Sequence, residues 1–335
     1  MKLKRTFGIA AAFLVVFAAI AINAQSPAYR ISTPYTHKNL TIFLIHGKNE
    51  TSKTNIITLP EALERRIFKV YETSDVNELM VENISREFDV FIQSGDIVKG
   101  GKQDRVLGIS IIIPARSGKV SIEAFCVESG RWEKRKNEDA SQFSSSDERI
   151  VSKELKLAAN DTRSQQEVWS KVAEAQKRLS DNVGGSVASE TSRTSLQLTL
   201  ENGKVAENTA EYVRALSNAV AGKSDVIGYA FAVNGQLNSA DIYVSNALFK
   251  KLWPRMLKAA AVEAVSHSRG VRLAEGAKPK DVTSFIADAD RGKAKSRPAS
   301  GASSVVTRED KDNVVFEARD DKSKLIVHRN YVKKQ

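Results

Sequence analysis

A group of polar and aromatic side chains near the middle of the chain could form a recognition site: Gln103, Arg105, Glu128, Arg131 and Trp132. Guanidinium groups form paired, charge-assisted hydrogen bonds with carboxylates and phosphates, and an indole stacks on planar groups. Apolar runs at 106–114 and 120–127 adjoin these residues and predict a β-hairpin, which would bring the group to one end of one sheet. The group shows no self-evident reaction, so it indicates binding of something anionic and planar.

The same residues also allow a purely structural interpretation. Glu128, Arg131 and Arg105 could form an ion-pair network that closes the end of the sheet, and Trp132 could cover the core. Buried arginine–carboxylate clusters serve both purposes, so the sequence leaves the two interpretations open.

Glu128 and Cys126 are the catalytic candidates. Glu128 could act as a general acid or base while Arg131 stabilises negative charge, with Asp104 as a second carboxylate. Cys126 would need a neighbouring base and a lowered pKa, and none of the four histidines is linked to it in sequence. A single cysteine in an apolar run is typical of a small buried hydrophobic side chain. We therefore predict that Cys126 is buried.

The sequence does not indicate metals, cofactors or nucleic acid. It has no His-x-x-x-His or Cys-x-x-Cys spacing and no acidic calcium loop. It also lacks the Gly-rich nucleotide-binding signatures, so we expect no cofactor. The formal net charge is +11, but no basic motif is interleaved with aromatic residues, so we expect no nucleic-acid partner.

Three motifs together carry a family resemblance. Gly-Gly-Lys-Gln-Asp-Arg at 100–105, Cys-Val-Glu-Ser-Gly-Arg-Trp at 126–132 and Gln-Gln-Glu-Val-Trp at 165–169 resemble a domain of unknown function over roughly residues 35–265. That domain is named for its genomic association with ADP-ribosylglycohydrolases and rhodanese-like phosphatases. Its relatives tend to have Gly-Asp before the third motif, where this chain has Arg163-Ser164. The resemblance implies recognition of a nucleotide or an ADP-ribose-like group.

The first 24 residues are expected to be a signal peptide. Lys2, Lys4 and Arg5 precede an apolar run from Phe7 to Ile22, which is short for a membrane span of about 20 residues. We expect cleavage and a secreted or periplasmic protein with no membrane span, and a retained anchor is the alternative. The mature chain then has a net charge of +8, which is the +11 of the whole sequence less three.

Hydrophobic patterning predicts an α+β fold. A β-rich N-terminal part, forming an antiparallel sheet or sandwich, is followed by helices and a second hairpin. The expected strands and hairpins are 40–46, 67–72, 78–83, 89–93, 106–127, an edge strand at 149–157, and a hairpin at 225–244 around Asn234-Gly235. The expected helices are 59–66, 164–180, 208–222 and 245–267.

We divide the chain into a signal peptide at 1–24, one α+β domain at 25–270, a low-complexity linker at 271–312 and a C-terminal hairpin at 313–335. A tethered hairpin could add strands to a sheet edge of its own protein or of a protein partner.

Three functions follow from these predictions, and the sequence does not decide whether the protein is an enzyme. The first is an exported binding domain for a small anionic or nucleotide-like ligand. The second is a hydrolase-type enzyme acting on a phosphorylated or glycosidic ligand. The third is a non-catalytic subunit of an envelope assembly.

Overall fold

The structure is a computed structural model that describes residues 29–50, 55–73, 75–131, 143–149, 152–270, 275–299 and 302–334. The predicted signal peptide and Trp132 lie outside these residues. The strands are β1 (Arg30–Ile31), β2 (Tyr35–His37), β3 (Leu40–His46), β4 (Ile56–Thr58), β5 (Phe68–Glu72), β6 (Glu78–Asn83), β7 (Asp89–Ile92), β8 (Asp96–Gly100), β9 (Arg105–Leu107), β10 (Ile111–Ile113), β11 (Lys119–Cys126), β12 (Phe143–Arg149), β13 (Val226–Val233), β14 (Gln236–Tyr243), β15 (Lys293–Pro298), β16 (Ser303–Glu309), β17 (Asn313–Asp320) and β18 (Ile326–Lys333). The helices are α1 (Leu59–Glu64), α2 (Lys153–Leu157), the π-helix η1 (Ala158–Thr162), α3 (Gln165–Val183), α4 (Leu196–Leu200), α5 (Gly203–Leu216), the 3-10 helix η2 (Ser217–Val220), α6 (Asn246–Ser266) and α7 (Pro279–Asp290).

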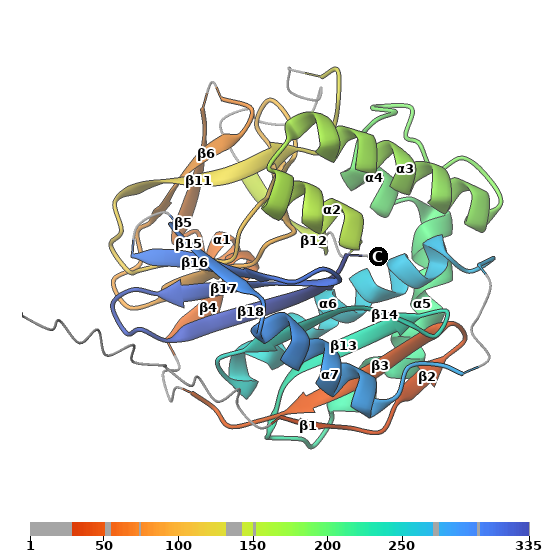
Figure 1. The fold of residues 1–335 in the computed structure, drawn as a ribbon. Helices are drawn as coiled ribbons and strands as arrows, with labels where there is room; N and C mark the ends of the chain where they lie inside the picture. Colours follow the sequence, from red (N-terminus) through yellow and green to blue (C-terminus); the bar gives the residue numbers. More distant parts are fainter. Residues whose placement is uncertain are drawn as a thin grey trace, which may run out of the picture.

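The largest sheet gathers strands from both ends and the middle of the chain. Within the described residues it has nine strands in the order β1-β3-β13-β14-β18-β17-β16-β15, with β2 paired to β3. Every pairing in it is antiparallel. Figure 1 shows the N-terminal strands in red and orange beside the β13–β14 hairpin, and the blue C-terminal strands beyond them. The protein is therefore α+β, as predicted.

Helices cover both faces of this sheet, so central strands such as β13 are buried on both sides. Along β13, Tyr229 and Phe231 pack into the core cluster that contains α6. The alternate residues Ala230 and Ala232 pack instead with Phe285 of α7. Side chains along a strand point alternately to opposite faces, so one strand contributes to two cores.

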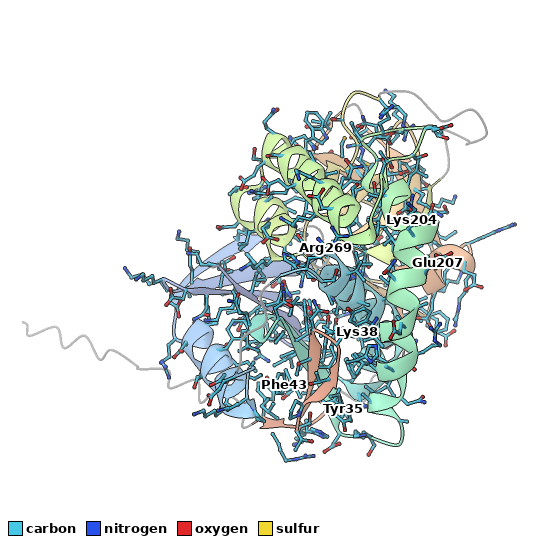
Figure 2. The ribbon with its side chains drawn as sticks, turned by 90° about the vertical axis from the view of Figure 1, so that its right-hand side faces the viewer. Tyr35, Lys38, Phe43, Lys204, Glu207 and Arg269 are labelled. Carbon is cyan, nitrogen blue, oxygen red and sulfur yellow. The ribbon has the colours of Figure 1, made fainter. Side chains whose placement is uncertain are left out.

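The hairpin formed by β2 and β3 lies against α5. Lys38 in its turn forms an ion pair with Glu211 of that helix. Figure 2 shows Tyr35 and Lys38 beside α5, which carries Lys204 and Glu207. No helix among the described residues is long and apolar enough to span a membrane.

Two smaller sheets are also present among the described residues, and one of them carries the predicted site. One has the order β12-β8-β9-β11-β6-β5 and the other β10-β7-β4. The predicted strand at 106–114 is divided between them, because the chain leaves the strand conformation at 108–110 and β10 pairs with β7. Of the two parts of this predicted strand, β9 pairs with β11 and β10 does not, and the β9–β11 pairing sets Arg105 opposite Cys126. The predicted hairpin is therefore wrong for β10 and right for the end that carries the site residues.

The C-terminal third differs from the predicted linker and separate hairpin. The described part of 271–312 contains α7, β15 and β16. The hairpin of β17 and β18 forms as predicted, but β17 pairs with β16 and β18 with β14. It lies inside the large sheet, because the valines and aromatic residues of these strands are buried there.

Local signals explain where several elements begin. Thr58 forms the predicted capping box with Glu61 at the start of α1. Asn234 and Gly235 both have positive φ, as a tight hairpin turn requires. The helix predicted from 208 instead begins at Gly203, capped by the Asn202 side chain. The edge strand predicted at 149–157 is replaced by the end of β12 and by α2.

Candidate functional site

The turn that carries the first motif wraps around the carboxylate of Glu72, the last residue of β5. Arg105 donates from a terminal guanidinium nitrogen to Glu72 Oε1 at 2.9 Å, and the Lys102 N–H donates to Oε2 at 3.0 Å. Gly101 has a φ of +60°, and a Cβ there would lie 2.3 Å from the Phe143 ring. Only glycine fits this position, because the backbone passes so close to the Phe143 ring and the Glu72 carboxylate.

The Arg105 guanidinium lies entirely inside the protein. Its side chain is 0% exposed, and that of Glu72 is 14% exposed. A second guanidinium nitrogen donates to the Val76 carbonyl at 2.7 Å. A carboxylate and a main-chain carbonyl therefore hold this arginine in the core, as buried charges require.

A second ion pair lies within the second motif. Glu128 is fully buried, and its Oε1 accepts hydrogen bonds from Arg131 Nε at 2.7 Å and from the Ser192 hydroxyl. The Gln103 amide donates to the main-chain carbonyl of Glu128 at 3.0 Å. Gln103 thus connects the turn at 100–105 to the strand end that carries Glu128.

The third motif joins the same cluster through Gln165 at the start of α3. The Cys126 N–H donates to Gln165 Oε1 at 2.8 Å, and the Gln165 amide donates back to the Cys126 carbonyl at 2.8 Å. The Cys126 side chain is fully buried, as predicted. Burial raises the pKa of its thiol to about 11, although the Arg105 guanidinium acts in the opposite direction. A protonated, buried thiol is a poor nucleophile, which favours the structural interpretation of this residue.

The structure therefore brings Gln103, Arg105, Cys126, Glu128 and Arg131 together. Asp104 accepts a hydrogen bond from the Gly100 N–H at 3.1 Å, so it stabilises the turn.

The sequence analysis missed the carboxylate of Glu72 and the hydroxyl of Ser192. Both are far in sequence from the cations or carboxylates they contact. For Glu72, the only indication in the sequence was its position at the end of the predicted strand 67–72. Both guanidiniums of the cluster are engaged with carboxylates, the arrangement expected of an ion-pair network.

A hollow of about 930 Å³ adjoins this cluster, which is within the range of small-molecule sites. We call it the α1–β5–β12 hollow, after the elements that line it. Arg66 and Lys69 are exposed at its wall, next to the half-buried rings of Tyr71 and Phe143. The Phe143 ring also contacts the turn at Gly101, so the hollow and the first motif share a wall.

Metal-binding side chains do not gather in the part of the chain that the structure describes. No group of three or more His, Cys, Asp or Glu residues there could hold an ion.

The fold and the cluster define an α+β protein in which three separated motifs meet around a buried cysteine and two buried ion pairs. The chain belongs to the ARG and Rhodanese-Phosphatase-superfamily-associated Protein domain family, ARPP-1, whose sequence model matches residues 28–334. The match continues past the predicted 35–265 and includes the C-terminal strands. No curated protein and no solved structure matches the chain.

Proposed function

We propose that this protein is an exported binding domain that recognises an anionic, nucleotide-like ligand in the α1–β5–β12 hollow. The supporting observation is the combination of cations and aromatic rings in one ligand-sized hollow that shares a wall with the family motif. Guanidinium and ammonium groups bind phosphate, and aromatic faces stack on bases.

The acidic residues of the hollow favour a ligand that contains a sugar over a bare phosphate. Glu64 and Asp147 line the same hollow as Arg66 and Lys69. Carboxylates accept hydrogen bonds from ribose hydroxyls but repel phosphate. An ADP-ribose-like ligand offers both groups, with the phosphates directed to the cations and a ribose directed to a carboxylate.

The motif residues act on this hollow from behind its wall. Arg105 holds Glu72, and Glu72 together with Lys102 fixes the turn against Phe143. Gln103, Glu128 and Arg131 tie that turn to the end of β11. In this proposal the motif residues position the wall of the hollow. Loss of the Arg105–Glu72 or the Arg131–Glu128 ion pair loosens this wall and thereby weakens ligand binding.

Isothermal titration with ADP-ribose, ADP and ribose 5-phosphate tests the proposal. Wild type should bind ADP-ribose most tightly, and Lys69→Ala should weaken binding at least about tenfold, which corresponds to roughly 1.4 kcal/mol. Lys322→Ala is the matched control, because Lys322 is an exposed lysine in the turn between β17 and β18. Absence of binding by wild type, or equal affinity in Lys69→Ala, would overturn the proposal.

The other two functions have weaker support. A hydrolase that uses Glu128 as acid or base requires that carboxylate to be released from Arg131 and Ser192; turnover that is lost in a folded Glu128→Gln variant would support it. Capture of a protein partner by the C-terminal hairpin would require two pairings in the large sheet to break. These are the pairing of β17 with β16 and that of β18 with β14.

Export rests on the N-terminal pattern of Lys2, Lys4 and Arg5 before the apolar run. The mass of the mature protein recovered outside the cytoplasm tests it, and a chain that begins at Gln25 is the expected product.

A further inference from the structure

The strand β15 lies at one edge of the large sheet and is exposed on most of its surface. Among the described residues it pairs only with β16, and Figure 1 shows the two strands side by side at the end of the sheet. Five of its six residues are exposed, and only Arg297 is half-buried. Lysine, alanine and proline, which make up much of it, are also depleted in strands. Little buried surface therefore offsets the entropy lost in ordering this strand, and a strand added to its open edge would supply further contacts.

The open edge of β15 offers main-chain hydrogen-bonding groups at alternate residues. The Ala299 N–H donates to the Ser303 carbonyl at 2.9 Å, in the same register as the pairing of β15 with β16. Because hydrogen-bonded residues alternate along an antiparallel strand, Ala294, Ser296 and Pro298 direct their main-chain groups away from β16. Pro298 has no N–H, so it occupies the side of an edge strand where proline is tolerated. Ala294 and Ser296 thus present N–H and C=O groups to an added strand.

Two lysines set the charge that an added strand would meet. Lys293 and Lys295 are exposed, and neither forms an ion pair with another described residue. Arg297, two residues further on, instead donates to both carboxylate oxygens of Glu123, at 2.7 and 3.0 Å. Alternate side chains of a strand lie on one face. The two lysines therefore share a face, at the spacing of alternate residues in a neighbouring strand.

A surface hollow of about 450 Å³ at the start of β15 extends this positive surface. Four basic residues line it: Arg291, Lys293, Lys295 and Lys311. Arg291 is paired with Asp288 of α7. Glu309 and Asp310 also line the hollow, but Lys334 binds Glu309, and main-chain N–H groups of the following turn donate to Asp310. The hollow therefore has an excess of positive charge, carried by its lysines.

We propose that β15 binds an extended acidic peptide segment of a partner protein, which adds to the open edge as a further antiparallel strand. Ala294 and Ser296 exchange main-chain hydrogen bonds with this peptide. The peptide residues opposite Lys293 and Lys295 then occupy the closer, non-hydrogen-bonded pairs, where side chains interact most directly. Carboxylates at these two alternate positions, as in Glu-x-Glu, meet the two ammonium groups. This surface shares no residue with the α1–β5–β12 hollow, so the proposal is independent of the ligand proposed there.

The charges of β15 argue against a second copy of this chain as the occupant. Antiparallel pairing of two β15 strands centred on Lys295 sets the two Lys295 side chains against each other and Lys293 against Arg297. Like charges in a cross-strand pair are destabilising. Lysines on an edge strand generally prevent unspecific pairing in this way. A strand with alternating carboxylates turns the repulsion into attraction, so the edge selects its partner by charge.

Fluorescence polarisation with the labelled peptide Gly-Val-Glu-Thr-Glu-Val-Gly tests the proposal. Wild type should bind it, and the variant Lys293→Glu/Lys295→Glu should bind it at least about tenfold more weakly. Methylation of the threonine amide nitrogen should weaken binding to a similar extent, because it removes a main-chain donor without changing charge. The isomer Gly-Val-Glu-Glu-Thr-Val-Gly should also bind weakly, because adjacent glutamates point to opposite faces. Lys322→Glu/Lys324→Glu is the matched control, since both lysines are exposed and lie between β17 and β18.

A peptide of reversed charge, Gly-Val-Lys-Thr-Lys-Val-Gly, should bind the Lys293→Glu/Lys295→Glu variant better than it binds wild type, which would support the assignment to these positions. Absence of binding between wild type and the acidic peptide would overturn the proposal. Equal affinity for the methylated peptide, or for a short single-stranded DNA, would also overturn it, because the surface would then attract any polyanion. Displacement of the peptide by ADP-ribose would overturn its placement on β15.

Discussion

Replacing Glu72 by leucine should destabilise the protein by about 3–5 kcal/mol, because it leaves a buried charge without its carboxylate. The Arg105 side chain is 0% exposed and that of Glu72 is 14% exposed, so water has little access to replace the lost partner. The Val76 carbonyl remains 2.7 Å from the guanidinium, but it carries no net charge. The exposed pair of Lys177 and Asp181 is the contrast, and its loss should cost no more than about 1 kcal/mol.

Urea unfolding followed by circular dichroism measures both costs. The double variant Glu72→Leu/Arg105→Met should regain most of the lost stability, because apolar side chains often replace a buried ion pair without net cost. Asp181→Ala serves as the surface control. A loss below about 1 kcal/mol in the single variant, or no recovery in the double variant, would refute this account of the ion pair.

Three further perturbations test neighbouring features. Burial raises the pKa of Cys126 from 9.0 to about 11, so the protonated thiol contributes roughly 3 kcal/mol of stability below pH 9, and this contribution is lost as pH rises to 11. The urea midpoint of wild type should therefore fall more than that of Cys126→Ala between pH 9 and 11. Gly101→Ala should cost about 2–4 kcal/mol and Gly118→Ala about 1 kcal/mol by thermal unfolding, since both have positive φ but only the former meets Phe143; equal costs would contradict the contact. Burial alone would raise the pKa of Asp241, but Lys156 and His328 lower it from 3.8 to about 2. Roughly 2 kcal/mol of stability should therefore be lost as pH falls from 4 to 2, and the Asp241→Asn variant should not show this loss.

Local patterns were sufficient to predict several elements and the place where the motifs meet. The strand at 40–46 follows from its apolar run, and the turn at Asn234-Gly235 follows from two residues that tolerate positive φ. Both signals depend only on neighbouring residues. Arg105 and Cys126 are adjacent as expected, because β9 does pair with β11.

Features that depend on contacts between distant residues could not be predicted in this way. Nothing near Arg105 indicates that Glu72 is its partner, because the two belong to different strands. The segment from 291 to 311 has a polar composition typical of a linker, but β16 within it pairs along its whole length with β17. Ser110 and His328 are 218 residues apart in the sequence, and their side chains meet only because the sheets bring their segments together.

The strand order of the large sheet also has a consequence for how the chain folds. β14 lies between β13, its neighbour in sequence, and β18, which follows much later in the chain. A chain still emerging from the ribosome therefore exposes one edge of β14 until β18 has been synthesised. Such late, long-range pairing slows folding and leaves an open edge for chaperones or for aggregation. Pairing of β18 should therefore control the rate of folding, and a nascent chain that lacks β18 should stay only partly folded.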